Sequence, residues 1–430
     1  MNYFKQIYYE MKHQKMMTWV SVGGTALAIF LVMALIMSES IYDVAVTPES
    51  NRDRILFGQG IHIKTGDNGD GSTMTMTYDM AKKLYSNLKG IELISYTGDG
   101  WNSVATLAAP GKPTMSGSKI TADANIWKIF DYRFIDGRPF NADEANSQAR
   151  VAVITRSTAR KLFSEDKVAG RQIDIDSYPY TIVGVIEDPN PLLTNSYVNI
   201  IRPYNPALSK SSEPWFGEVA VLLLAKEGAD ISNIKSEVKQ RYDRIGIELQ
   251  KEGKDIYYHE QPYTSREMSI SFFGSNTSPD VETHDTINII ILAILILLPA
   301  INLSSMTRSR LRHRVSEIGV RRAFGAKKTS IISQIFTENL IITLIGGIIG
   351  LVLSLIFLIF FSSFLFQFNN SLGLSSPDSL NANPDFSMLF RWENFFGALV
   401  LCFVLNILSA TVPAWKASKV QPAVALSGSR

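Results

Sequence analysis

Residues that could do chemistry are present in the chain, but their spacing forms no catalytic or metal-binding motif. Residues 111–114 (Gly-Lys-Pro-Thr) come nearest to a phosphate-binding loop, yet they lack its upstream glycine and place proline where a backbone N–H must donate. Asp174 and Asp176 alternate along an expected strand, which indicates a solvated face rather than an acid/base pair. The five histidines are scattered, with no paired spacing for zinc: His13, His62, His259, His284 and His313. We therefore predict a non-catalytic protein that binds no metal or cofactor directly.

The most regular pattern is a basic segment, residues 308–330, with the sequence RSRLRHRVSEIGVRRAFGAKKTS. It carries eight Lys and Arg residues against one carboxylate, Glu317. Cytoplasmic loops of membrane proteins are basic in any case, and this bias alone explains most of the charges. It does not explain their order along the segment.

That order predicts an amphipathic helix over residues 308–324. Glu317 precedes Arg321 by four residues, the favourable direction for an ion pair on a helix. Gly325 is expected to end the helix, and Gly319 inside it indicates close approach of a partner backbone. The expected apolar stripe consists of Leu311, Val315 and Ile318. Such a helix has the shape needed to dock into a cleft of a cytoplasmic protein.

Four apolar windows make the chain, with 46% hydrophobic residues, more apolar than an ordinary soluble protein. Each offers about 20 or more residues, enough to cross a hydrocarbon core of about 30 Å. The windows are residues 18–38, 286–306, 331–362 and 394–415. The first could be a cleaved signal peptide, but its apolar run is long and no small-residue cleavage site follows. We predict an α-helical membrane protein with four transmembrane helices.

The distribution of Lys and Arg predicts the topology. Three segments are basic: residues 1–17, 307–330 and 416–430. The loop 363–393 has only Arg391, so it and residues 39–285 are expected outside, with both termini in the cytoplasm. Residues 1–17 also show helical apolar spacing, which indicates an amphipathic helix on the membrane surface, although a frayed basic leader is an alternative.

Residues 39–285 are expected to form a large extracytoplasmic α/β domain. The only cysteine, Cys402, lies in the fourth window, so disulfides cannot hold this domain. Strand, helix and strand patterns occur at residues 54–98 and again at 217–263, which predicts two β-α-β units packed together. Residues 114–215 would be an inserted mixed subdomain. Its expected core aromatics are Trp127, Phe130, Phe134 and Phe140.

Few polar residues occur within the apolar windows. Asn302 and Asn406 are expected to form hydrogen bonds between helices rather than a conduction path. Gly346 and Gly350 have the small-xxx-small spacing of a close helix contact.

Several of these stretches together resemble MacB/FtsX-type ABC transporter permeases. In the basic segment and the third window these are Glu-Ile-Gly, Arg-Arg-Ala and Gly-Ala, then a Gln and a Glu one turn apart and a glycine-rich span. The ending VPAWKASKVQPAVAL is similar to that of the same family. IDGRPF, VAVITRSTARKLF and YTIVGVIEDPN resemble the MacB periplasmic core domain. The resemblance covers essentially the whole chain.

The resemblance implies a dimeric permease subunit of the bacterial inner membrane that transmits motion from an ABC ATPase to its periplasmic domain. The second protomer would be a copy or a paralogue. The positions matching the family's ATPase-coupling pattern are Arg314, Glu317, Gly319, Arg321, Arg322, Gly325 and Ala326. MacB itself carries a fused ATPase domain before its first span and this chain carries none, so ATP and Mg²⁺ are expected in a separate subunit.

Four functions stay open at this point. The leading hypothesis is export of a peptide, toxin, lipid or drug, with a periplasmic adaptor and an outer-membrane duct as further partners. Release of a lipoprotein, in the manner of the LolC/LolE subunits, is the closest alternative. An FtsX-like regulator of a cell-wall hydrolase and a two-component sensor fit less well, the latter because only a short tail follows the last window. No nucleic acid partner is predicted.

Overall fold

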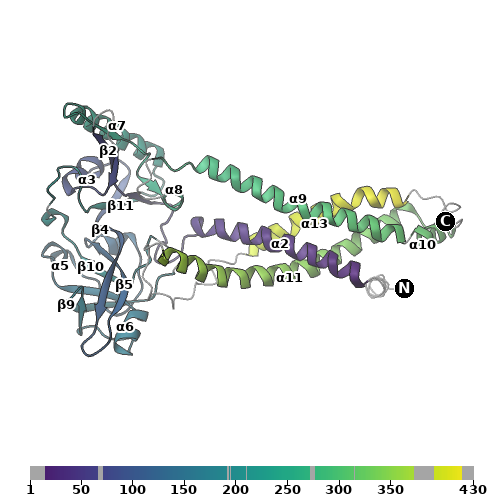
Figure 1. Ribbon diagram of the computed structural model, residues 1–430, viewed down its shortest axis with the longest axis horizontal. Helices are drawn as coiled ribbons and strands as arrows, with labels where there is room; N and C mark the ends of the chain where they lie inside the picture. The colour runs from purple at the N-terminus through teal and green to yellow at the C-terminus, as the bar shows by residue number, and fades with distance from the viewer. Residues whose placement is uncertain are drawn as a thin grey trace. The chain divides into compact units, whose positions relative to one another are not determined.

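The computed structural model of the protein describes residues 15–65, 71–190, 193, 195–209, 211–271, 277–313, 315–371 and 392–418 (Figure 1). The chain divides into a helical unit, within residues 1–40, 283–360 and 389–430, and a unit within residues 41–282 and 361–388 that contains the α/β domain. The predicted amphipathic helix at 1–17, the loop 363–393 and the tail lie largely outside the described residues.

Five helices form the described part of the helical unit. They are α2 (Lys15–Asp43), α9 (Val281–His313), α10 (Val315–Ala323), α11 (Lys328–Ser371) and α13 (Trp392–Ser418). Two stretches within them, Thr18–Met37 and Lys328–Phe357, are long and apolar enough to cross a membrane. The helices overlap all four predicted windows, and α9 and α11 extend well beyond theirs.

Gly346 and Gly350 of the third window lie against α2. A Cβ at Gly346 would stand 2.8 Å from the Thr25 Cβ, and one at Gly350 would stand 2.6 Å from the Ala26 carbonyl oxygen. Both distances are shorter than a carbon atom tolerates, so only glycine permits this separation of α2 and α11. The rings of Phe30 and Phe357 extend the contact edge to face, at 5.3 Å.

One ten-stranded sheet runs through the α/β unit. Its strand order is β13-β1-β11-β4-β5-β10-β7-β9-β6, with β8 paired to β4 and β9. The bounds are β1 (Ile55–Gly58), β4 (Ile91–Ala108), β5 (Met115–Ala122), β6 (Phe134–Gly137), β7 (Val151–Thr155), β8 (Gln172–Ile175), β9 (Tyr178–Ile186), β10 (Ile200–Pro203), β11 (Ala220–Ala225) and β13 (Tyr263–Thr264).

A second sheet has three strands in the order β12-β2-β3, namely β2 (Ile61–Thr65), β3 (Ser72–Met74) and β12 (Lys254–Tyr257). Figure 1 shows α3 (Tyr78–Tyr85) and α7 (Ile231–Gln250) at the end of the α/β unit that carries β2. The other helices are α4 (Ile126–Ile129), α5 (Ala142–Asn146), α6 (Arg156–Phe163), α8 (Ser265–Ile270) and the 3-10 helix η1 (Pro206–Leu208).

The two predicted β-α-β halves do meet, because β11 pairs on one side with β1 and on the other with β4. Both pairings are antiparallel, and residues 54–63, expected to be one strand, divide into β1 and β2 in different sheets. The insertion is not a separate layer, because the 18-residue β4 carries the main sheet directly into the inserted strands. Backbone hydrogen bonding therefore makes the two predicted parts of the α/β domain continuous.

The expected aromatic core of the insertion is confirmed. Phe130 and Phe140 are fully buried in one cluster, and Trp127 and Phe134 pack against it. The Trp127 ring meets the rings of Phe140 at 4.9 Å and Phe134 at 5.4 Å, both in edge-type geometry. These rings fill the space beside the main sheet.

Candidate functional site

The apolar side of α10 is anchored on α11. Ile318 is only 7% exposed and packs in one cluster with Ile331 and Ile335, which lie four residues apart on α11. Burial of these three side chains fixes α10 against the first turns of the long helix. The backbone of Gly319 is also buried.

A hydrogen-bonded chain of polar side chains joins the same two helices. Arg321 donates from Nη1 to Oε1 of Gln334 at 2.8 Å, and Gln334 donates from Nε2 to Oε1 of Glu338 at 3.2 Å. The Gln and Glu lie one turn apart on α11, as the sequence shows, and the structure adds that Gln334 links Glu338 to a base of the basic segment. This arrangement aligns α10 on α11.

A left-handed turn ends α10. Gly325 has φ +89, and the Ala326 N–H donates to the Arg321 carbonyl at 3.0 Å. The Phe324 N–H donates to the Val320 carbonyl at 3.1 Å. The bond from Ala326 to Arg321 is the 6→1 bond of a Schellman motif, which favours glycine at the left-handed position. The predicted end of the helix at Gly325 is confirmed.

The turn presents an aromatic side chain to the outside of the helical unit. Phe324 is 89% exposed, and the residues beside it, Ala323 and Gly325, are also exposed. A Cβ at Gly325 would meet nothing within 4 Å. An exposed phenylalanine on a fixed, otherwise basic turn is typical of a docking residue. The sequence analysis missed Phe324, although it stands out as the one aromatic residue in the segment.

The predicted coupling helix over residues 308–324 falls on two described helices. Residues 308–313 belong to α9 and residues 315–323 form α10, with Arg314 between them outside the described residues. The apolar stripe that joins Leu311 to Ile318 stays a prediction. Arg314 and the side chains of Glu317 and Arg322 lie outside what the structure describes, so the ion pair between Glu317 and Arg321 stays a prediction. The side chains of Asn302 and Asn406 are likewise outside it.

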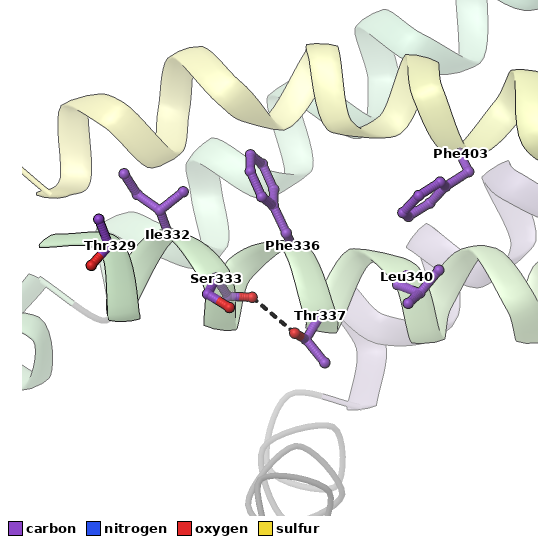
Figure 2. Close-up of a pocket in the computed structure, with 7 residues that line it drawn as sticks. All are labelled: Thr329, Ile332, Ser333, Phe336, Thr337, Leu340 and Phe403. Carbon is purple, nitrogen blue, oxygen red and sulfur yellow. Dashed lines mark hydrogen bonds between the residues drawn. The ribbon is translucent and has the colours of Figure 1, made fainter.

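A cavity of about 340 Å³ lies on the opposite face of α11, toward α13 (Figure 2). Phe336 points from α11 toward α13, and Phe403 comes from α13 itself. The remaining lining residues are Thr329, Ile332, Ser333, Thr337 and Leu340. Thr337 donates its hydroxyl to the Ser333 carbonyl at 2.9 Å, so its polar atom is already satisfied by the helix. The first turns of α11 thus contact α10 with one face and line this apolar space with the other.

Two carboxylates of the α/β unit, Asp176 and Asp123, have structural partners. Asp176 is not on a strand as expected, but in a turn, where it accepts from the Thr106 N–H at 2.9 Å and Lys119 Nζ at 3.3 Å. Burial raises the pKa of Asp123, which accepts from Ser95 Oγ at 2.7 Å and from two backbone N–H groups. Residues 111–114 form a turn, as predicted, with Gly111 at φ +75.

Two histidine clusters were not visible in the sequence. A His284 ring nitrogen and carboxylate oxygens of Glu39 and Asp285 lie within 4.8 Å of one another, at the ends of α2 and α9. In the α/β unit, His62 Nδ1 lies 2.8 Å from His259 Nε2. Sequence spacing cannot reveal either cluster, because each joins segments that are distant along the chain.

Comparison with known proteins places these features in one class, the membrane permeases of ABC transporters that carry an external core domain. Residues 18–241 match the MacB-like periplasmic core domain, and residues 289–422 match the FtsX-like permease C-terminal domain. The chain belongs to the MacB/FtsX-type ABC transporter permeases. In this family the ATPase resides in a fused domain or a partner, while the permease part is generally non-catalytic.

Curated relatives include the macrolide export ATP-binding/permease protein MacB of Pasteurella multocida, 26% identical over 318 residues, 71% of this chain and 43% of the relative. The uncharacterized ABC transporter permease YknZ of Bacillus subtilis is 25% identical over 67% of this chain and 64% of the relative. MacB of Chromobacterium violaceum is 23% identical over 95% of this chain and 59% of the relative. The chain thus spans about half the length of the curated relatives it matches.

Among solved structures, the periplasmic region of MacB from Actinobacillus actinomycetemcomitans matches 48% of this chain and 89% of its own, with 14% identity and a TM-score of 0.34. The extracellular domain of YknZ matches 46% of this chain and 99% of its own, with 15% identity and a TM-score of 0.34.

Proposed function

We propose that this chain is the membrane subunit of an ABC exporter and that α10 with its Phe324 turn is the surface on which a separate ATPase subunit docks. The observation that carries the proposal is the pairing of a highly exposed aromatic tip with a base fixed to α11 by Ile318 and by the Arg321–Gln334 hydrogen bond. A docking element must be exposed at its tip and rigid at its base if it is to pass on a displacement.

The path of the displacement follows from the packing. The 44-residue α11, about 66 Å long at 1.5 Å per residue, contacts α10 near its start and α2 through Gly346 and Gly350. A movement of the ATPase against Phe324 is transmitted to α11 and then to α2. The chain continues from α2 into the α/β unit and returns from it into α9, so both connections to that unit belong to helices of the moving assembly.

In the proposed topology, α2, α9, α11 and α13 all span the bacterial inner membrane, and both termini and the basic segment are cytoplasmic. The support is the Lys and Arg bias, which gives the α/β unit and residues 363–393 the opposite side. Asn302 and Asn406 would then contribute hydrogen bonds between spans. A second permease protomer, a copy or a paralogue, completes the dimer. ATP and Mg²⁺ are bound by the ATPase subunit.

Export of a peptide, toxin, lipid or drug is the function we assign, on the strength of the relatives named for macrolide export. A periplasmic adaptor and an outer-membrane duct are the partners this function requires in a bacterium with two membranes. A lipoprotein that accompanies the purified chain would instead indicate lipoprotein release, and a cell-wall hydrolase would indicate an FtsX-like regulator.

The test is purification of the full chain from its native host in mild detergent, with mass spectrometry and an ATPase assay on the eluate. The variant Phe324→Ala removes the docking residue, and Phe360→Ala is its matched control, because Phe360 is also an exposed phenylalanine of the helical unit but lies far along α11. We expect an ATPase with the wild type and with the control, and loss of at least ten-fold in ATPase recovery with Phe324→Ala. Equal recovery with both variants, or no ATPase with the wild type, would contradict the proposal.

A further inference from the structure

The α/β unit contains a histidine pair built by the three-stranded sheet. His62 lies on β2 directly opposite Tyr257 of β12, and His259 follows two residues later on the same side of the chain. The Tyr257 ring stacks on His62 with centroids 4.9 Å apart. The sheet therefore brings together two imidazoles that are 197 residues apart in the sequence.

The two rings form one linear hydrogen bond. His62 Nδ1 and His259 Nε2 are 2.8 Å apart, the ring centroids are 5.1 Å apart and the ring planes differ by 14°. The distance between the ring centroids equals the N···N distance plus the distance from each ring centre to its own nitrogen. The rings therefore lie end to end in almost one plane, with a proton between the two nitrogens, which is the best geometry for an N–H···N bond.

The His62 side is fixed by its surroundings. This residue is 7% exposed, and its Nε2 has no hydrogen-bond partner among the described residues. Gly71 packs so closely that a Cβ there would stand 1.9 Å from Nε2. The ring cannot swing toward Gly71, so it is held in the orientation that directs Nδ1 at His259.

The same bond also excludes a shared metal ion in this geometry. Zinc needs about 2.0–2.1 Å to each imidazole nitrogen. Two nitrogens aimed at each other across 2.8 Å leave no space for an ion on the line between them. The bridge therefore holds a proton.

Proton counting shows how the bridge opens. The neutral pair holds two protons, one of them in the bridge, and a third proton binds an outer nitrogen without breaking the bond. A fourth proton must occupy the accepting nitrogen, so the hydrogen bond is lost. The two rings are then both imidazolium ions, and their positive charges repel each other. Burial lowers the pKa of both histidines, and the charge of His259 lowers that of His62 further.

Other charged groups near the pair are balanced. On β2 and β12, Lys64 stands opposite Asp255 in the strand register, and Lys254 stands opposite the neutral Thr65. The described β3 carries no titratable group, and Glu260 is the next residue after His259. In the part of the chain that the structure describes, the two residues directly before His259 are also titratable, the phenols Tyr257 and Tyr258.

A second set of bonds lies next to the pair. Gln261 accepts from the Gln59 N–H at 2.9 Å and donates to the Gly60 carbonyl at 3.0 Å. The histidine pair attaches His259 to β2, and Gln261 is attached by hydrogen bonds to Gln59 and Gly60 in the connection between β1 and β2. Residues 263–270 of β13 and α8 follow directly, and then the chain returns to α9.

We propose that the His62–His259 pair is a proton-operated clasp, which holds the returning chain on β2 at neutral pH and releases it in acid. Its location outside the cytoplasmic membrane rests on the proposed function, and there it is exposed to the pH of the surroundings. When the His62–His259 bond is broken, the hydrogen bonds of Gln261 to Gln59 and Gly60 are the nearest remaining contacts that hold this segment. The consequence is a looser connection between the three-stranded sheet and the chain that leads to α9.

The first test uses the full chain in lipid nanodiscs with ¹⁵N-labelled histidine rings. The sequence has five histidines, so His62→Asn and His259→Gln assign the pair directly. We expect two coupled signals that titrate below the ordinary histidine value. Independent titration of His62 and His259 at the ordinary value would overturn the proposal.

The second test measures amide hydrogen exchange of residues 61–65 and 254–260 in the wild type and in His259→Gln, at the same pH in each comparison. Glutamine can hydrogen bond to His62 Nδ1 but does not titrate. We expect protection in the wild type to fall at least ten-fold relative to the variant between pH 7 and pH 5, and His284→Gln to behave as the wild type. Equal pH dependence in all three chains would refute the clasp. Neither test involves the ATPase, so its outcome is independent of the proposed function.

Discussion

The contact between α2 and α11 gives a graded prediction, because three glycines of the helical unit differ in the room available for one added methyl group. At Gly350 the Cβ would lie 2.6 Å from the Ala26 carbonyl oxygen and 3.0 Å from the Ile29 Cβ. Both neighbours are close to the backbone of α2 and cannot move without it. At Gly347 the nearest atom, at 3.0 Å, is the Leu399 Cδ1 at the end of a flexible side chain. At Gly397 nothing lies within 4 Å.

The magnitudes follow from these distances. A carbon–oxygen contact needs more than 3 Å, so Gly350→Ala must displace α2 and α11 by several tenths of an ångström. Overpacking of this kind costs about 1–3 kcal/mol. Gly347→Ala requires only a change of the Leu399 rotamer, about 0.5–1.5 kcal/mol. Gly397→Ala is neutral or stabilises by up to about 1 kcal/mol, because alanine is the better helix former.

The assay is thermal unfolding of the full chain in one detergent, followed by tryptophan fluorescence, for the wild type and the three alanine variants. The expected order of midpoints is Gly397→Ala at or above the wild type, then Gly347→Ala, then Gly350→Ala. An unchanged midpoint for Gly350→Ala would refute the close contact with α2. A loss for Gly397→Ala as large as that for Gly350→Ala would show a general effect of helix glycines instead.

Three further changes test other contacts. Ile318→Ala empties the contact between α10 and α11 and should destabilise it by about 2 kcal/mol, seen as faster amide exchange of α10; unchanged exchange would contradict the anchoring. Because the pKa values of His62 and His259 are lowered in the folded protein, the unfolded chain binds more protons below about pH 6.5. Their contribution to stability is complete above that pH and is lost as pH falls through the folded pKa values, so the thermal midpoint of the wild type should fall more steeply in acid than that of His259→Gln. Asn141→Ala removes the N-cap of α5 and should cost about 1 kcal/mol in denaturant unfolding, whereas Asp143→Asn, outside the capping box, should not.

Patterns within short stretches of the sequence predicted apolar helices, the end of α10 and the buried aromatic residues. Two of the four apolar windows coincide with stretches of the described helices that are long and apolar enough to cross a membrane, and the order of charges and glycine around Gly325 marks the end of α10. The buried aromatics near Trp127 were also predictable, because large apolar side chains in an α/β pattern have few other places to go.

Features that depend on pairing at long range were not predictable from one sequence. Nothing near residue 98 indicates that β4 continues into the inserted strands, because strand register is decided by partners far away in the chain. Phe324 was overlooked because exposure depends on what covers a residue, and its sequence context shows only that it is aromatic.

The length of β4 has a mechanical consequence for the α/β unit. Its 18 residues bond to β11 near one end, to β5 along most of its length and to β8 near the other end. A hinge between the two halves of the unit would have to break several of these backbone bonds at once. The strand therefore acts as a stiff element that links β11, which pairs with β1, to β8 at its far end.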